Sequence, residues 1–183
     1  MDLNGRRIAF LMANEGVEQV ELTEPWKAVE QAGGEPVLVA PEPGKVQAFH
    51  HLDRADTFPV DETVADADAG SFDGLMLPGG VANPDHLRTI PEAVDFVKAF
   101  FSAGKPVAAI CHAAWMLVES GAVKGRTVTS WPSIKTDIRN AGGTWVDEEV
   151  HTENGLVTSR KPDDLPSFCK KMVEEFAEGR HAR

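Results

Sequence analysis

Two neighbouring residues, Cys111 and His112, have the chemistry of a nucleophile and a base, and they lie in the stretch KPVAAICHAAWML (residues 105–117). The apolar run before them predicts a buried strand, and the residues after them predict a helix. A nucleophile at such a turn needs small residues two positions before and after it, and Ala109 and Ala113 meet that requirement. The positive end of the following helix predicts a lowered pKa for the thiol. The alternative is a buried cysteine that packs as a small hydrophobic residue.

A pair of glycines, Gly79 and Gly80, ends another buried-strand pattern, FDGLMLPGG. Glycines in this position let the backbone approach a ligand closely and point N–H groups at an oxyanion. Taken alone, the PGG sequence is a common turn. Beside a cysteine at a strand-to-helix turn it predicts an oxyanion hole, with the N–H groups of Gly80 and His112 as the donors.

Length and charge limit the classes of protein to be considered. A chain of 183 residues is long enough for one domain with a sizeable core, and no linker divides it. We therefore expect a single domain over residues 5–178, with terminal tails at 1–4 and 179–183. The formal charge of −11, from 18 basic and 29 acidic residues, repels phosphate groups and predicts no nucleic-acid or membrane partner.

The two cysteines, Cys111 and Cys169, are expected to be free thiols. No secretory signal is apparent and no stretch reaches the roughly 18 apolar residues of a membrane span, so the sequence predicts a cytoplasmic protein. Thiols stay reduced in that compartment. Neither cysteine has the spacing of a zinc ligand, and we expect no metal and no cofactor.

Short apolar runs alternate with amphipathic helices along the chain. Strands are expected at 7–13, 36–41, 72–80, 106–110, 126–131, 144–146 and 155–159, with a hairpin or short strands within 43–70. Helices are expected at 20–34, 91–106, 112–123 and 132–143. A final helix carries an apolar stripe with Cys169 in it, which predicts a core position for that thiol; the stripe is Leu165, Phe168, Cys169, Met172, Val173 and Phe176.

This alternation predicts an α/β fold, a three-layer sandwich with a mostly parallel central sheet and helices on both faces. Sites in such sheets form beyond the carboxyl ends of the strands. Three segments follow strands and should meet there: ANEG, LPGGVANPDH and ICHAA.

Four motifs in order carry a family resemblance: FDGLMLPGG, PVAAICHAAWML, SWPSIKTDIRNAGG and NGLVTSRKPDDLPSF. From about residue 5 to about 178 the chain resembles the ThiJ/PfpI superfamily, within the flavodoxin-like, class I glutamine amidotransferase-like fold. It is most similar to the branch of PfpI-type intracellular proteases and bacterial general stress proteins.

The resemblance implies roles for particular residues. It implies that Cys111 is the nucleophile and that Glu15, after the first strand, hydrogen-bonds its sulfur through a protonated carboxyl. His112 is the implied base, and Asp85 of a neighbouring subunit is the implied carboxylate that orients it. The chain would then be a homodimer or a higher homo-oligomer with a shared active site. The alternatives are a solvated loop acid for Glu15 and a helix N-cap for Asp85.

Other residues with potential chemistry are interpreted as structural. His151 to Glu153 have the His-x-Glu spelling of class I glutamine amidotransferases, but a turn at Asn154 and Gly155 should leave them exposed beside it. The adjacent His50 and His51 have no third metal ligand at a useful spacing, so we expect both on the surface. The four tryptophans are expected in the core or in subunit contacts, with Trp115 lining the pocket.

Two functions from different classes follow. The first is a cysteine-dependent enzyme that attacks a carbonyl, for which the resemblance implies peptide hydrolysis, glyoxalase-type conversion of 2-oxoaldehydes, or removal of early glycation adducts. Its partner would be a small carbonyl compound or a peptide substrate. The second is an oxidative-stress sensor or chaperone in which the same Cys111 is oxidised.

Overall fold

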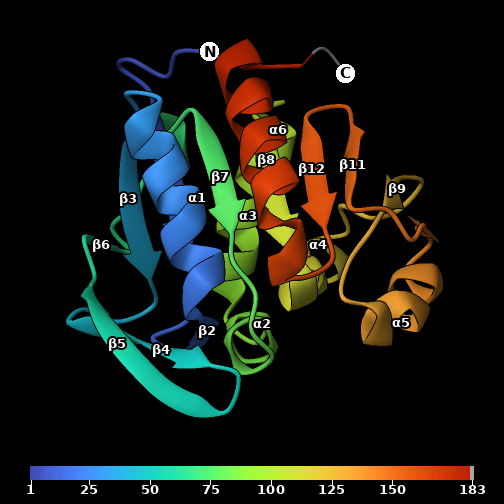
Figure 1. The fold of residues 1–183 in the computed structure, drawn as a ribbon, viewed down its shortest axis with the longest axis horizontal. Coiled ribbons are helices and arrows are strands. Elements are labelled where there is room, and N and C mark those ends of the chain that lie inside the picture. Colours follow the sequence, from blue (N-terminus) through green and yellow to red (C-terminus); the bar gives the residue numbers. More distant parts are fainter. Residues whose placement is uncertain (182–183) are drawn as a thin grey trace.

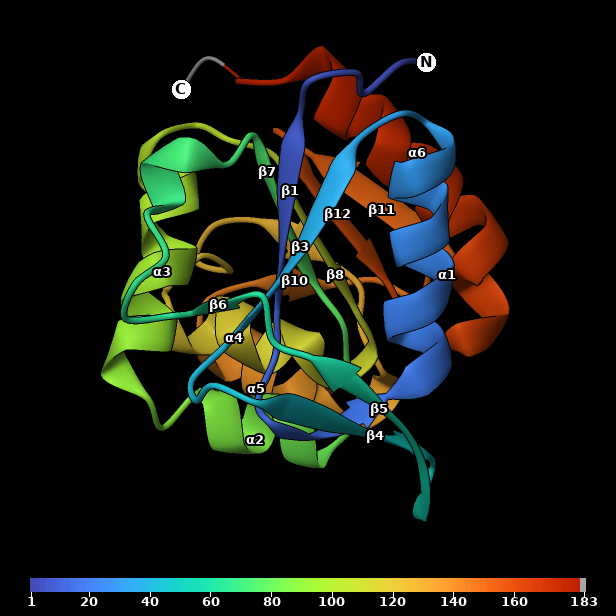
Figure 2. The ribbon, with the colours of Figure 1, turned by 90° about the vertical axis from the view of Figure 1, so that its left-hand side faces the viewer.

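A computed structural model describes residues 1–181 of the chain. A central sheet of seven strands lies between two layers of helices (Figures 1 and 2). The strand order is β11-β12-β8-β7-β1-β3-β6, and of these pairings only β11 with β12 is antiparallel. This confirms the predicted α/β sandwich with a mostly parallel sheet.

The central strands are short, and each has a precise register with its neighbours. They are β1 (Arg7–Leu11), β3 (Glu35–Ala40), β6 (Glu62–Thr63), β7 (Gly74–Leu77), β8 (Val107–Ile110), β11 (Val150–Glu153) and β12 (Leu156–Ser159). A separate three-stranded sheet has the order β2-β4-β5, from β2 (Glu15–Glu18), β4 (Lys45–His50) and β5 (Asp53–Pro59). The pair β9 (Thr127–Val128) and β10 (Thr144–Trp145) completes the strands.

Helices cover both faces of the central sheet (Figure 2). On one face lie α1 (Gln19–Gln31) and α6 (Leu165–Glu178), and on the other lie α3 (Pro91–Ser102), α4 (Ala114–Glu119) and α5 (Lys135–Asn140). The short α2 (Ala82–Leu87) sits at the end of the molecule toward which β7 and β12 point (Figure 1). No helix within residues 1–181 is long and apolar enough to cross a membrane.

Strand β1 is apolar and buried from Ile8 to Leu11, because it faces a helical layer on each side. Ile8 and Phe10 belong to the core cluster that contains residues of α1 and α6, whereas Ala9 and Leu11 belong to the cluster formed with α3 and α4. Successive side chains of a strand point to opposite faces, so a strand covered on both sides has no polar face. This explains why the buried strands were recognisable as continuous apolar runs.

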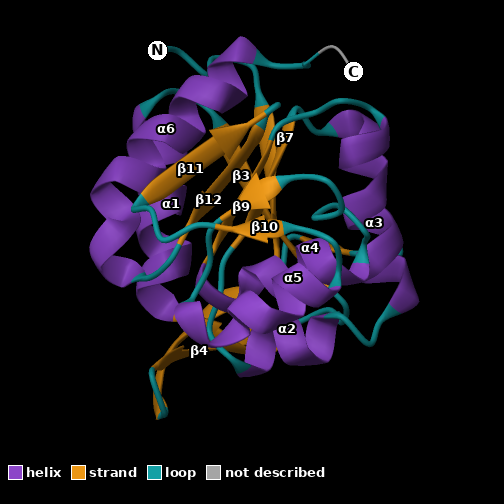
Figure 3. Cartoon of the chain, turned by 90° about the vertical axis from the view of Figure 1, so that its right-hand side faces the viewer, coloured by secondary structure: helices purple, strands orange, loops and turns teal. Residues whose placement is uncertain are grey.

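The structure differs from the sequence prediction in the stretch 126–131. Only Thr127 and Val128 are in a strand, which pairs with β10 outside the central sheet. The backbone N–H of Thr129 donates to Thr158 Oγ1 at 3.0 Å instead of to another strand's backbone. The predicted hairpin within 43–70 is confirmed as β4 and β5, which project from the body of the molecule (Figures 2 and 3).

The terminal segments pack against the domain. Leu3 is fully buried and its N–H donates to the carbonyl of Ala32, so residues 1–4 include part of the core. At the other end, His181 N–H donates to Gly104 O. Of the predicted tail 179–183, residues 182–183 lie outside the described chain. Cys169, a residue of α6, is half-buried against the core, less enclosed than predicted.

Candidate active site

Cys111 occupies a strained turn between β8 and α4. Its φ is +63°, in the left-handed region that residues other than glycine rarely adopt. A short 3-10 helix, Cys111–Ala113, leads from the strand into α4, and the flanking Ala109 and Ala113 are both buried. The predicted strand-to-helix turn is therefore present, and two alanines fit where strand and helix crowd together.

The carboxyl group beside Cys111 belongs to Glu21. Glu21 lies in the first turn of α1, is fully buried, and hydrogen-bonds the Cys111 sulfur. Its Oε1 accepts the Gly80 N–H at 3.1 Å. Glu21 therefore holds the position that the resemblance assigned to Glu15.

The assignment of Glu15 was wrong in position. Glu15 lies in β2, is exposed, and pairs with Arg54 of β5 at 3.3 Å. Between β1 and α1 the chain inserts β2, which carries Glu15 away from the sulfur. The sequence contained a signal for the correct residue, because Glu21 is spaced four and eight residues before Pro25 and Val29 on the buried face of α1. An acid on an apolar stripe is a candidate for a special role.

Burial controls the proton equilibria at this pair. Burial, together with the nearby Glu18 carboxylate, raises the pKa of Glu21 to about 8. Burial, and next the charge on Glu21, also raises the pKa of the Cys111 thiol, although the N–H groups of His112 and Gly80 act in the opposite direction. The predicted lowering of the thiol pKa is therefore not what the structure gives. With its pKa of about 8, Glu21 is largely protonated at neutral pH, while its hydrogen bond with the Cys111 thiol acts in the opposite direction and lowers the Glu21 pKa. Glu21 is therefore the protonated carboxyl beside the sulfur that was expected of Glu15.

His112 provides the base next to the thiol. Its Nδ1 lies 3.2 Å from Cys111 Sγ. The ring is stacked with Trp131 at 5.8 Å between centroids and contacts Trp115 at 5.3 Å. Burial lowers the pKa of His112, so the imidazole is neutral at neutral pH and Nδ1 is free to accept the thiol proton.

The PGG loop brings its backbone against the pair. A Cβ at Gly79 would lie 2.7 Å from Glu21 Oε1 and 2.8 Å from Cys111 Cβ, so only glycine fits there. Gly80 has φ of +81°, and its N–H and that of His112 are the two amides directed at the Cys111 sulfur. These are the donors predicted for an oxyanion hole, although the Gly80 N–H also donates to Glu21 Oε1, and the Gly79 N–H is directed at Glu21 as well.

Asn83 holds this loop in place, and no pattern in the sequence singled it out. Its buried side chain accepts from Ala13 N at 2.7 Å and donates to Pro78 O at 2.9 Å and Gly79 O at 3.0 Å. One amide therefore ties the loop after β7 to the end of the first strand. Asn83 was hidden because its role depends on contacts across 70 residues of sequence.

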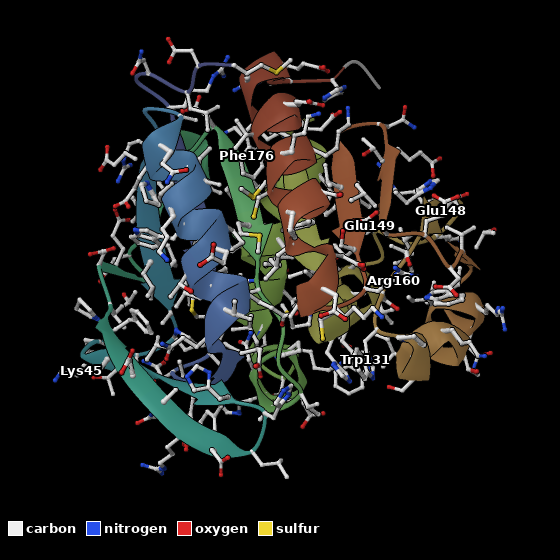
Figure 4. The ribbon with its side chains drawn as sticks, viewed as in Figure 1. Lys45, Trp131, Glu148, Glu149, Arg160 and Phe176 are labelled. Atoms are coloured by element: carbon white, nitrogen blue, oxygen red, sulfur yellow. The ribbon has the colours of Figure 1, made fainter. Side chains whose placement is uncertain are left out.

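A cavity of about 630 Å³ opens onto Cys111 and His112. Glu21, Gly80 and Trp131 are among the residues that line it. Figure 4 places Trp131 at the end of the molecule where α2 and the β4–β5 hairpin lie, opposite to Phe176. The predicted lining residue was Trp115, whose indole instead donates to Asp137 at 2.8 Å. The volume is in the range of small-molecule sites.

Asp85 is exposed on α2 and lines the same cavity of its own chain. No residue within 1–181 hydrogen-bonds the second ring nitrogen, Nε2, of His112. The structure therefore brings Asp85 to the site but does not pair it with the histidine. The N-terminal cap of α2 is Val81, so the alternative of Asp85 as an N-cap is wrong.

Of the remaining predicted residues, His151 and Glu153 differ from the prediction, whereas His50 and His51 agree with it. His151 and Glu153 lie half-buried in β11, not in an exposed turn, and Glu153 Oε2 accepts Thr127 N–H at 2.6 Å. The predicted turn at Asn154 and Gly155 is confirmed: it joins β11 to β12 and lies at the end of β12 that is remote from Ser159. His50 and His51 are both exposed, as predicted, although His51 lines the cavity.

The fold and this site define a class of α/β protein with a cysteine at a strand-to-helix turn and a buried carboxyl beside it. Residues 6–175 match the model of the DJ-1/PfpI family, and the chain belongs to that family.

Relatives cover nearly the whole chain. It is 39% identical to the putative cysteine protease YraA of Bacillus subtilis over 92% of this chain and 96% of that one. It is 41% identical to general stress protein 18 of Bacillus subtilis, with the same coverage of 92% and 96%. It is 38% identical to the deglycase PfpI of Pyrococcus furiosus, over 92% of this chain and 98% of that one.

A solved structure from Anabaena variabilis, a two-domain protein with DJ-1/ThiJ/PfpI-like and ferritin-like domains, superposes with a TM-score of 0.88 at 31% identity. The match covers 94% of this chain and 48% of that one, so this chain spans about half of the two-domain protein. The likeness extends the family assignment to the three-dimensional fold.

The first prediction concerns Glu21 and stability. The folded-state pKa of Glu21, about 8, is raised above its ordinary value of 4.5, so between these pH values the native state binds a proton that the unfolded chain has lost. The free energy of unfolding of the wild type should therefore fall, relative to Glu21→Gln, by up to roughly 1.4 kcal/mol per pH unit across that window. Urea unfolding at a series of pH values measures it.

Glu15→Gln is the matched control, because Glu15 is exposed and pairs only with Arg54. Its unfolding free energy should run parallel to that of the wild type. Parallel curves for Glu21→Gln and the wild type would show that Glu21 does not hold a proton in the native state.

Proposed function

We propose that this protein is a cysteine-dependent enzyme that acts on small carbonyl compounds, converting 2-oxoaldehydes, or the early adducts they form with amines, to 2-hydroxy acids. The observation that carries the proposal is the 3.2 Å contact between Cys111 Sγ and a neutral His112, within a cavity of about 630 Å³. Relatives named as deglycases at 38% and 39% identity support this choice of chemistry.

The reaction would begin with addition of Sγ to the aldehyde carbon while His112 Nδ1 accepts the thiol proton. The N–H groups of Gly80 and His112 would hold the resulting oxyanion, and the protonated Glu21 would keep the sulfur oriented. Transfer of the proton from the aldehyde carbon to the adjacent carbon then gives a thioester. Water hydrolyses it, releasing the hydroxy acid and returning a proton to Cys111. The net change is addition of one water molecule, with no external oxidant. An amine adduct would enter by displacement of the amine from the same carbon, and the amine would leave with the thiol proton.

The burial of Cys111 and its contact with a neutral His112 favour an enzyme over an oxidation sensor. Peroxide reacts with thiolate, and burial keeps this thiol protonated until a base removes its proton. A contact with His112 supplies that base when a carbonyl substrate is present. The alternative is an oxidative-stress role, which needs the thiolate in the resting protein; one relative is named general stress protein 18.

The second prediction tests the reaction. Methylglyoxal should be converted to lactate, detected by NMR, with Cys111→Ala inactive and His112→Asn slower by about 100-fold because the general base is lost. Glu15→Gln should retain wild-type turnover. Casein cleavage is measured in parallel, since a relative is named a putative cysteine protease. Lactate formation that survives Cys111→Ala, or Cys111-dependent cleavage of casein without lactate, would contradict the proposal.

The third prediction concerns a site shared between subunits. We propose that the chain forms a homo-oligomer in which Asp85 of a neighbouring copy orients His112. The support is that Nε2 of His112 has no hydrogen-bond partner within residues 1–181. Cys111→Ala and Asp85→Asn should each be nearly inactive, and equal amounts refolded together should recover roughly a quarter of wild-type activity in a randomly mixed dimer.

Native mass spectrometry shows whether mixed oligomers have formed. Mixed oligomers without any recovered activity would exclude a role for Asp85 across the interface. Full activity of Asp85→Asn alone would show that the carboxylate is dispensable.

A further inference from the structure

The tip of the β4–β5 hairpin carries an unusual residue for its backbone. His51 and Leu52 form a two-residue loop between the paired His50 and Asp53. His51 has φ of +56°. A positive φ at the first position of such a loop normally selects glycine, because other residues are strained there.

Strained residues gather at the cavity. Among residues 1–181, three residues other than glycine have positive φ: His51, Cys111 and Asn154. The first two line the same cavity, and Asn154 lies in a turn at the far end of β12, where asparagine is a favoured residue. Strain that is retained beside a reactive group indicates a function for the strained residue.

Polar contacts hold the tip in place. The N–H of His51 donates to Glu18 Oε2 at 3.0 Å. Gln19 and Asp56 exchange two hydrogen bonds of 2.8 Å each. The hairpin that these bonds dock projects past the body of the molecule, at the end where α2 lies (Figures 2 and 3).

The imidazole of His51 is available to a ligand. No residue of the described chain hydrogen-bonds its side chain, whereas its backbone is anchored through Glu18. His51 lines the cavity, and its ring nitrogens are not occupied by any residue of the described chain.

Exposed apolar side chains surround the same cavity. The large hydrophobic residues exposed within 1–181 are Met1, Leu52, Val81 and Trp131, and the last three all line the cavity. Leu52 is 95% exposed. A leucine that is fully in water at the mouth of a cavity adds no buried area to the fold, and together with Val81 and Trp131 it forms an apolar rim that a ligand in the cavity would cover.

We propose that the hairpin tip is the substrate-recognition element of the Cys111 site. His51 hydrogen-bonds an oxygen of the substrate, while Leu52, Val81 and Trp131 enclose an apolar substituent. The site therefore prefers carbonyl compounds with an aromatic or branched aliphatic group, such as phenylglyoxal, over methylglyoxal. This inference rests on the proposed function in its choice of substrate, since both place a carbonyl carbon at Cys111.

Alkylation of Cys111 tests the inference without requiring turnover. Bromoacetone and phenacyl bromide carry the same α-bromoketone and differ only in a methyl or a phenyl group. Rates at Cys111, measured by peptide mass spectrometry, are normalised to the rate of each reagent with glutathione. The wild type should prefer phenacyl bromide by about 10-fold, as expected when a pocket accepts a larger apolar group.

Two variants separate the two roles. Leu52→Ser should slow phenacyl bromide by about fivefold and leave bromoacetone unchanged, because only the apolar contact is lost. His51→Gly should slow both reagents, because both present a carbonyl oxygen. Glycine is the residue that the backbone favours at position 51, so the thermal midpoint of His51→Gly should not fall.

Two further variants serve as matched controls. His50→Ala removes the adjacent imidazole, which does not line the cavity, and should leave both rates unchanged. Asn154→Gly changes another residue of positive φ at a hairpin turn and should also leave them unchanged.

Unchanged rates for His51→Gly and Leu52→Ser would overturn the inference. A change in oligomeric state for these variants, with the ratio of the two rates preserved, would overturn it too, and would assign the tip to a contact between copies. If the tip variants change the rates but neither methylglyoxal nor phenylglyoxal is consumed by the wild type, the proposed function fails and the recognition element stands.

Discussion

The site depends on the contact between a buried carboxyl group and a buried thiol. Glu21 and Cys111 share an environment in which a charge on one destabilises a charge on the other, and burial raises the pKa of both. One proton on Glu21 resolves this conflict, because a neutral carboxyl can donate to the sulfur. The other features of the site either position these two groups next to each other or determine which of them holds the proton.

The fold brings them together at the carboxyl ends of parallel strands. The nucleophile follows β8, the glycine loop follows β7, and the carboxyl enters from the first turn of α1. Gly79 sets how closely they approach, since a side chain there would meet both Glu21 and Cys111. Asn83 fixes the loop by bonding to Pro78 and Gly79. Strain at Cys111 is thus maintained by rigid neighbours on several elements.

Features that depend on a few consecutive residues could be predicted from the sequence. Buried strands, the strand-to-helix turn at Cys111 and the PGG donors each rest on a few consecutive residues. The position of the carboxyl depends on β2, a four-residue strand that pairs with β4 more than 25 residues later, as in the register of Glu15 with Gln47. The thiol pKa was predicted with the wrong sign because the helix end is visible in the sequence, whereas the extent of burial around Cys111 is not. Trp131, and not the predicted Trp115, lines the cavity, and this too depends on packing between residues that are distant in the sequence.

Infrared difference spectroscopy of the wild type minus Glu21→Gln tests the shared proton most directly. A protonated carboxyl has a C=O stretching band that an ionised one lacks. Because the pKa of Glu21 is raised to about 8, we expect this band at about pH 6 and its loss as the pH rises past about 8. We also expect the frequency of the band to shift when Cys111 is replaced by alanine. A difference spectrum that contains only ionised carboxylate bands at about pH 6 would contradict it.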